Sequence, residues 1–138
     1  MNRALAVLLL AALVTGAGCS SFAKLRSEDP ALTEDEVAAA GAPGAPADLV
    51  PHLVNVVMHR DRYSTGAVVA AVEALGRRND PSAVPALAGL AHDPNEELRW
   101  HAARALKSID GAAAASALAD MAAHDASELV REEAGAAR

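Results

Sequence analysis

The stretch "AVPALAGLAHDPNEELRWHAARALKSI", residues 83–109, contains two apolar patterns of helical spacing separated by a polar turn. In the turn, Asp93 is expected to cap the second helix, Pro94 suits its first position, and Glu96 follows three residues after the cap. Apolar residues then recur on one stripe, at Leu98, Ala102, Ala105, Leu106 and Ile109. Alanine is abundant and period-two alternation is lacking, which disfavours strands. The stretch therefore predicts a pair of helices.

The same pattern recurs along the rest of the chain after residue 48. Segments 48–61, 82–93 and 113–125 each end in His and then Asp, with one Arg inserted in the first. Equivalent Ala-Leu pairs, at 74–75 and 105–106, lie 31 residues apart. A period in the low thirties is typical of stacked helical hairpins rather than of a globule with a single core. We therefore predict an all-α fold, a short α-solenoid of helical hairpins over residues 48–138.

These residues also resemble a known repeat. Residues 80–109, with Asp-Pro, Ala-Val-Pro-Ala-Leu, a second Asp-Pro, Leu-Arg and Ala-Ala-Arg-Ala-Leu, look like the HEAT-like repeat first noted in phycobilisome lyases. The resemblance covers residues 48–138 and implies a HEAT-like solenoid. It says little about function, because such repeats serve lyases, hydroxylases, adaptors and scaffolds alike.

The first 18 residues have the layout of a secretory signal, with Arg3 before a short apolar run. The single cysteine, Cys19, follows "TGAG" and resembles the lipobox of bacterial lipoproteins, although Gly16 stands where an apolar residue is usual. That resemblance implies a diacylglycerol on Cys19 and a lipid-anchored, exported protein. Ser20 after the cysteine implies the outer membrane, facing the periplasm. The alternative is an ordinary cleaved signal peptide with an incidental cysteine.

Residues 19–47 are expected to form a flexible tether between the lipid and the repeats. The motif "GAPGAPA", residues 41–47, mixes the residues of flexible or semi-extended spacers. Within this segment, Thr33 and Glu36 have the spacing of a capping box, which predicts a short helix that stops at Gly41.

The charge balance bears on the class of partner. From residue 27 onward the chain carries 18 acidic and 9 basic residues, a net charge of −9. Such a surface repels phosphate backbones and anionic headgroups, so we expect neither nucleic-acid binding nor a polybasic membrane patch.

Catalysis is not expected. The iron-binding deoxyhypusine hydroxylases, built from similar repeats, place His-Glu pairs where this chain has Trp100-His101 and Glu132-Glu133. His59, His92 and His124 recur one repeat apart, which is too far for one ion, and are expected to interact with helix ends. We therefore predict no metal, no cofactor and no enzyme activity. A small metal- or cofactor-dependent lyase or hydroxylase module using His101 is the alternative.

Trp100, His101 and Arg104 remain unexplained by the repeat pattern. Trp100 lies about 200° around the helix from Leu98, away from the apolar stripe. Exposed Trp with Arg nearby is typical of binding hot spots, so we predict that these three residues contact a protein partner in the envelope. The alternatives are that Trp100 packs against a neighbouring helix, or that the protein is a purely structural envelope component. Self-association through the solenoid ends is a further expectation.

Overall fold

The computed structural model describes residues 22–136, and these residues form helices without strands. The predicted lipid site, Cys19, and the predicted signal peptide lie outside the described residues. The helices within the described residues are α2 (Ala23–Arg26), α3 (Glu34–Ala40), α4 (Val50–Met58), α5 (Thr65–Arg78), α6 (Val84–Gly89), α7 (Glu96–Ser108), α8 (Ala112–His124) and α9 (Glu128–Gly135). Short 3-10 turns join several of them: η1 (Ala47–Leu49), η2 (Arg60–Arg62), η3 (Pro81–Ala83) and η4 (Leu90–His92).

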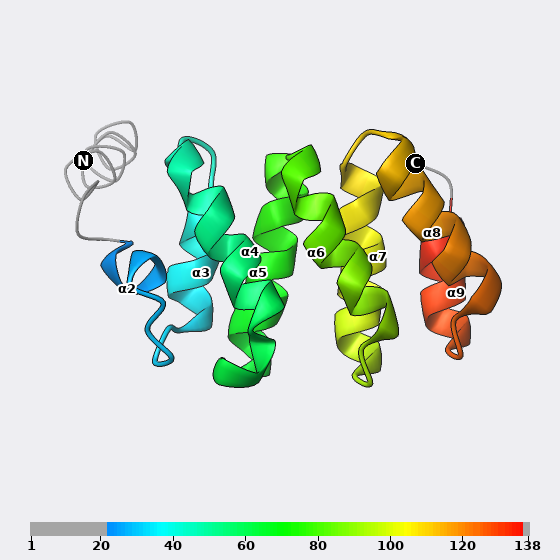
Figure 1. Cartoon of the computed structure of the whole chain (residues 1–138), viewed down its shortest axis with the longest axis horizontal. Coiled ribbons are helices and arrows are strands. Elements are labelled where there is room, and N and C mark those ends of the chain that lie inside the picture. The colour runs from blue at the N-terminus through cyan, green and yellow to red at the C-terminus, as the bar shows by residue number, and fades with distance from the viewer. Residues whose placement is uncertain (1–21, 137–138) are drawn as a thin grey trace, which may run out of the picture.

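Consecutive helices pair as hairpins, which stand side by side in one row that runs from α2 to α9 (Figure 1). The pairs are α4 with α5, α6 with α7, and α8 with α9. The second helices of the pairs stack on one another in the order α3, α5, α7, α9, and their contacts are more extensive than those between α4, α6 and α8. We call the layer formed by α3, α5, α7 and α9 the inner layer. The predicted all-α solenoid of helical hairpins is confirmed.

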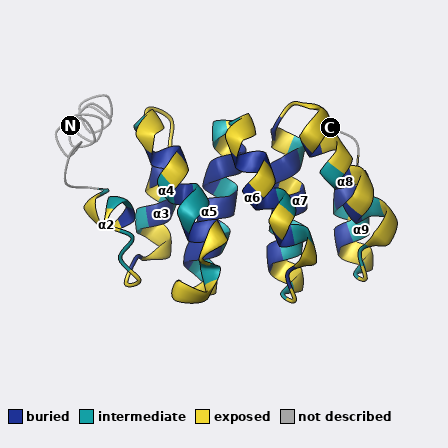
Figure 2. Ribbon diagram, viewed as in Figure 1, coloured by how far each residue is buried: buried dark blue, intermediate teal, exposed yellow. Residues whose placement is uncertain are grey.

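The apolar stripe predicted for α7 forms the centre of the core. Leu98, Ala102, Ala105, Leu106 and Ile109 are all buried. Buried residues lie along the interior of the row, between the two layers, and exposed residues lie on its outer surfaces (Figure 2). Because many of the core residues are alanines, neighbouring helices approach closely. At the crossing of α5 and α7, a Cβ added to Gly76 would lie 3.0 Å from the Cα of Ala105.

The start of α7 differs from the expectation. Asn95, not Asp93, is the N-cap, and its side chain accepts a hydrogen bond from the backbone N–H of Glu97 at 2.9 Å. Asp93 instead accepts from the N–H of Asn95 at 2.8 Å and is buried beneath the turn. The Asp-Pro-Asn sequence offers two capping side chains, and burial of the first leaves the second to cap the helix.

The segment before residue 48 also differs from the expected flexible tether. From Phe22 onward it is folded onto the repeats, and α3 packs against α5 as the first helix of the inner layer. Leu25, Leu32, Val37 and Ala40 are buried in the common core. The packed unit therefore includes residues 22–47, and residue 48 is not its boundary.

A network of backbone contacts explains why the Gly-Pro-Ala stretch is ordered. The guanidinium of Arg78, at the end of α5, donates hydrogen bonds to the carbonyls of Ala40, Ala45 and Pro46 at 3.0, 3.2 and 2.5 Å. Gly44 supplies the positive φ of 84° that the turn requires. Composition alone indicates a spacer, but a cation from 32 residues further along the chain holds it in place.

The capping box predicted at the start of α3 is confirmed. The Thr33 hydroxyl accepts from the N–H of Glu36, and the Glu36 carboxylate accepts from the N–H of Thr33 at 2.9 Å. The hydrogen bond from Thr33, together with the ion pair to Lys24, lowers the pKa of Glu36 to about 2. The helix ends at Gly41, as expected.

Candidate interaction surface

Two arginine–aspartate ion pairs link successive units of the row. The Arg99 guanidinium on α7 donates from Nε and Nη2 to both carboxylate oxygens of Asp125 in the next unit, at 3.0 and 3.2 Å. Its Nη1 also donates to the backbone carbonyl of Asp93 at 2.9 Å. The Arg60 guanidinium makes the corresponding ion pair with Asp93. Asp93 and Asp125 are therefore each joined to the preceding unit by a charge-assisted bond.

The carboxylate of Asp125 is stabilised in its charged form. Burial by itself raises the pKa of Asp125, but the hydrogen bonds from Arg99 and the N–H of Ser127 outweigh it. The positive charges of Arg99 and Arg131 act in the same direction. The net effect is a pKa below the usual value for aspartate, because the charged form has more favourable interactions than the neutral one.

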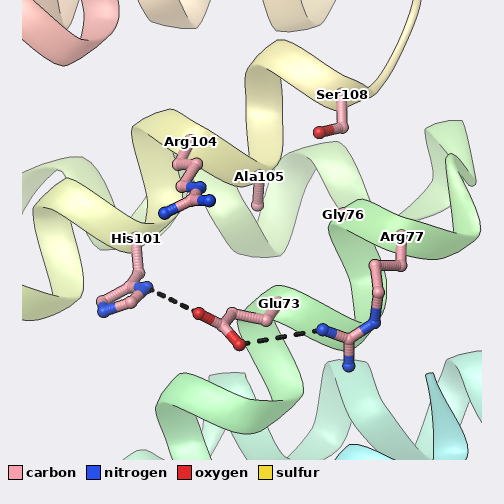
Figure 3. Close-up of a pocket in the computed structure, with 7 residues that line it drawn as sticks. All are labelled: Glu73, Gly76, Arg77, His101, Arg104, Ala105 and Ser108. Carbon is pink, nitrogen blue, oxygen red and sulfur yellow. Dashed lines mark ion pairs between the residues drawn. The ribbon is translucent and has the colours of Figure 1, made fainter. Parts of the chain in front are cut away.

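A groove of about 280 Å³ lies between α5 and α7 (Figure 3). Gly76 and Ala105 line it where the helices cross, and the remaining lining residues are polar or charged: Glu73, Arg77, His101, Arg104 and Ser108. The Glu73 carboxylate lies 3.7 Å from the Arg77 guanidinium and 3.3 Å from His101 Nδ1. His101 Nδ1 is buried and lacks a hydrogen bond of good geometry within the described structure. The groove thus gathers charged side chains from two inner helices.

Trp100 lies beside this groove on α7 and is half-buried. Its ring packs partly against the core, and its remaining surface lines a shallow depression with Glu96, Glu97 and Leu129. Leu129 on α9 is one of the few large apolar side chains that stay exposed, at 61%. The Arg104 guanidinium lies over the Trp100 ring at 5.4 Å, and the His101 ring meets it edge-on at 4.9 Å.

The structure brings together all three residues predicted from the sequence, Trp100, His101 and Arg104. Both expectations for Trp100 describe part of its environment, since one part of the ring packs inward and another lines the surface depression. Sequence reasoning did not single out Glu73, Arg77, Ser108 or Leu129. The repeat offset of 31 residues offered a signal for two of them, because it aligns Glu73 with Arg104 and Arg77 with Ser108.

Two of the recurring histidines interact with the ends of their own helices, as expected. Nδ1 of His59 lies 3.1 Å from the carbonyl oxygen of Asn55, and that of His124 lies 3.2 Å from the carbonyl oxygen of Asp120. Within residues 22–136, no group of three or more His, Cys, Asp or Glu side chains is placed to hold a metal ion. In the same part of the chain, no helix has both the length and the apolar character needed to cross a membrane.

A row of helical hairpins with a continuous inner layer and fastened turns defines the class of α-solenoid repeat proteins. The family described as HEAT repeats matches residues 50–137, and the chain belongs to that family. Among curated proteins and among solved structures, none matches the chain.

Proposed function

We propose that this protein is a non-catalytic lipoprotein, anchored through a lipid on Cys19, that binds a protein partner in the bacterial envelope. HEAT repeats commonly mediate protein–protein interaction, and the inner layer provides the surface for it here. We place the repeats nearer to the phycobilisome-lyase type within the family on the motif of residues 80–109, without that group's enzymatic activity.

The observation that carries the binding proposal is the continuous surface of α7 and α9 around Trp100. A half-exposed Trp with a guanidinium over its ring lies between an exposed leucine and a charged groove. Trp and Arg are the side chains most enriched at interface hot spots, where an apolar anchor is surrounded by polar groups. Trp100 and Leu129 give a partner apolar area to bury here, with Glu96 and Glu97 at the edge of the same depression.

The partner surface predicts a position-dependent crosslink in cells. A photo-crosslinking amino acid at position 129, beside Trp100, is expected to capture one protein, whereas the same amino acid at Ala119 on the outer helix α8 is not. Both positions are exposed, so the difference between them is that position 129 lies on the inner layer and position 119 does not. Adding Trp100→Ala is expected to reduce the crosslink about tenfold, the effect of losing a hot-spot side chain.

Circular dichroism serves as the control for this experiment. The helical signal of Trp100→Ala should stay near that of the unmodified chain, because only part of the ring packs against the core. Equal crosslinking from positions 129 and 119 would exclude a discrete inner surface and would favour a purely structural envelope component. Stoichiometric iron or zinc in the purified protein would overturn the non-catalytic part of the proposal.

The anchor predicts a defined chemical modification. Mass spectrometry of the N-terminal peptide is expected to show cleavage before Cys19 and a diacylglycerol on its sulfur. Cys19→Ser should abolish both the added mass and recovery in the membrane fraction, since the sulfur is the atom that would carry the lipid. An unmodified Cys19 would contradict the lipid anchor. It would have no bearing on the proposed binding surface.

A further inference from the structure

The groove between α5 and α7 concentrates positive charge on an acidic protein. Arg77 from α5 and Arg104 from α7 both line it, with Glu73 as the single carboxylate among the lining residues (Figure 3). The rest of the chain has the opposite balance, with 18 acidic and 9 basic residues from residue 27 onward. Electrostatic complementarity at this place therefore favours an anionic group.

Arg104 is the cation available to such a group. Within residues 22–136 it makes no ion pair, and its guanidinium lies over the Trp100 ring at 5.4 Å. Arg77, by contrast, already has the Glu73 carboxylate 3.7 Å away. An aromatic ring beneath a guanidinium restricts its orientation and leaves its N–H edge open, which suits two parallel hydrogen bonds to a carboxylate.

The groove also has room for a side chain. Gly76 and Ala105, the smallest residues that line it, meet at the helix crossing. Because these two residues are small, the groove between the charged side chains stays open. The exposed Leu129 and the free surface of Trp100 lie on the other side of Arg104's helix, along the same inner layer. A partner segment with an acidic residue in the groove would therefore have to cross α7 to reach Trp100 and Leu129, whose depression also contains Glu96 and Glu97.

We propose, building on the protein-binding function above, that the inner layer recognises an acidic segment of its partner. A Glu or Asp carboxylate of that segment pairs with Arg104 in the groove, and a neighbouring apolar side chain packs on Trp100. Glu73 opposes this binding, because its own carboxylate neutralises Arg77 and repels the incoming one. The surface is therefore selective for a segment that has a carboxylate and an apolar side chain at the right distance from each other.

The single tryptophan allows a direct test on the full chain, in detergent if the lipid is present. All tryptophan emission comes from Trp100, which lies against Arg104. The probe is the pentapeptide acetyl-Glu-Leu-Glu-Leu-Glu-amide, compared with the peptide in which Gln replaces each Glu and with one in which phosphoserine does. Titration is followed by emission and, in parallel, by calorimetry. The Glu peptide is expected to bind about fivefold more tightly than the Gln peptide, as for a partly exposed charge pair.

Three variants assign the effect to the groove. Arg104→Gln is expected to weaken binding of the Glu peptide about fivefold, and Glu73→Gln to strengthen it about threefold. Arg62→Gln is the matched control, because Arg62 also lies over an aromatic ring, Tyr63 at 6.0 Å, but does not line the groove. Its affinity should equal that of the unmodified chain.

The outcomes separate this inference from the proposed function. Equal binding of the Glu and Gln peptides, tighter binding of the phosphoserine peptide, or an unchanged affinity in Arg104→Gln would each overturn carboxylate recognition. If any of these is found while the crosslink from position 129 persists, the protein-binding function stands and the acidic partner is wrong. If position 129 gives no crosslink while the Glu peptide still binds more tightly than the Gln peptide, the proposed function would be overturned instead.

Discussion

Replacing Asp125 with alanine is expected to lower the free energy of unfolding by about 3 kcal/mol, the cost of removing one member of a buried ion pair. The Asp125 side chain is 3% exposed and that of its partner Arg99 is 13% exposed, so the cation would remain desolvated and unpaired. The substitution also removes the acceptor for the N–H of Ser127, before α9. Urea denaturation followed by circular dichroism at neutral pH measures the change.

Asp120 offers a matched control on the adjacent helix. Its side chain is 59% exposed and lies 3.1 Å from His124 Nδ1, so Asp120→Ala removes a surface contact only. We expect a change within about 0.5 kcal/mol. If the two alanine variants were equally stable, the ion pairs between turns would not contribute to the stability of the row.

The effect of Asp125 should also depend on pH. A carboxyl group whose pKa is lowered by folding contributes its full stabilisation above its unfolded pKa of about 3.9. That contribution is lost as the pH falls through the lower pKa of the folded state. The Asp125→Asn variant lacks it throughout, so the stability difference from the unmodified chain should shrink on acidification below about pH 4. A difference that stayed constant to lower pH would contradict the depressed pKa.

Replacing Leu106 with alanine is expected to destabilise the protein by about 3 kcal/mol or more, within the range found for buried leucines. Leu106 is fully buried on α7, the helix that contacts α5, α6, α8 and α9. Many residues of the common core are alanines, whose short side chains cannot fill the space that Leu106 would leave. Thermal and urea unfolding both measure the loss.

The same substitution at Leu129 distinguishes the effect of losing a core leucine from that of losing a surface leucine. Leu129 is 61% exposed on α9, so Leu129→Ala should change the free energy of unfolding by no more than about 0.5 kcal/mol. Its expected effect is on binding, since it lines the depression beside Trp100. A destabilisation as large as that of Leu106→Ala would show that Leu129 belongs to the core rather than to the partner surface.

Periodicity predicted the repeats because it depends on local residues. The spacing of Leu98, Ala102 and Leu106 determines which side of α7 is buried, whatever the neighbours are. The family match over residues 50–137 covers nearly the same region as the predicted solenoid. Capping at Thr33 and the end of α3 at Gly41 were equally local, and both were predicted correctly.

Contacts between distant residues explain what the sequence did not predict. Nothing in "GAPGAPA" indicates that Arg78 will bind the carbonyl groups of Ala45 and Pro46, so a folded segment was mistaken for a tether. Asp93, the predicted cap, instead pairs with Arg60 from the preceding unit. Neither Arg78 nor Arg60 is close in sequence to the residues that it contacts.

The candidate surface was predicted in part for a similar reason. Trp100, His101 and Arg104 share one turn of α7 and could be grouped from the sequence alone. Glu73 and Arg77 meet them only because α5 and α7 stack closely at Gly76. Residues of successive repeats had to be aligned before this pairing could be seen.

The stacking of the inner layer has a consequence for how the protein opens. In the part of the chain that the structure describes, α9 packs mainly on α7 and α8, whereas α7 packs on helices of both neighbouring units, so α9 should open before α7 does. A partner lying across α5, α7 and α9 would hold α9 to the centre of the row. Binding would then slow amide hydrogen exchange well beyond the residues that the partner touches. The free and bound proteins would have the same backbone structure but would differ in how cooperatively they unfold.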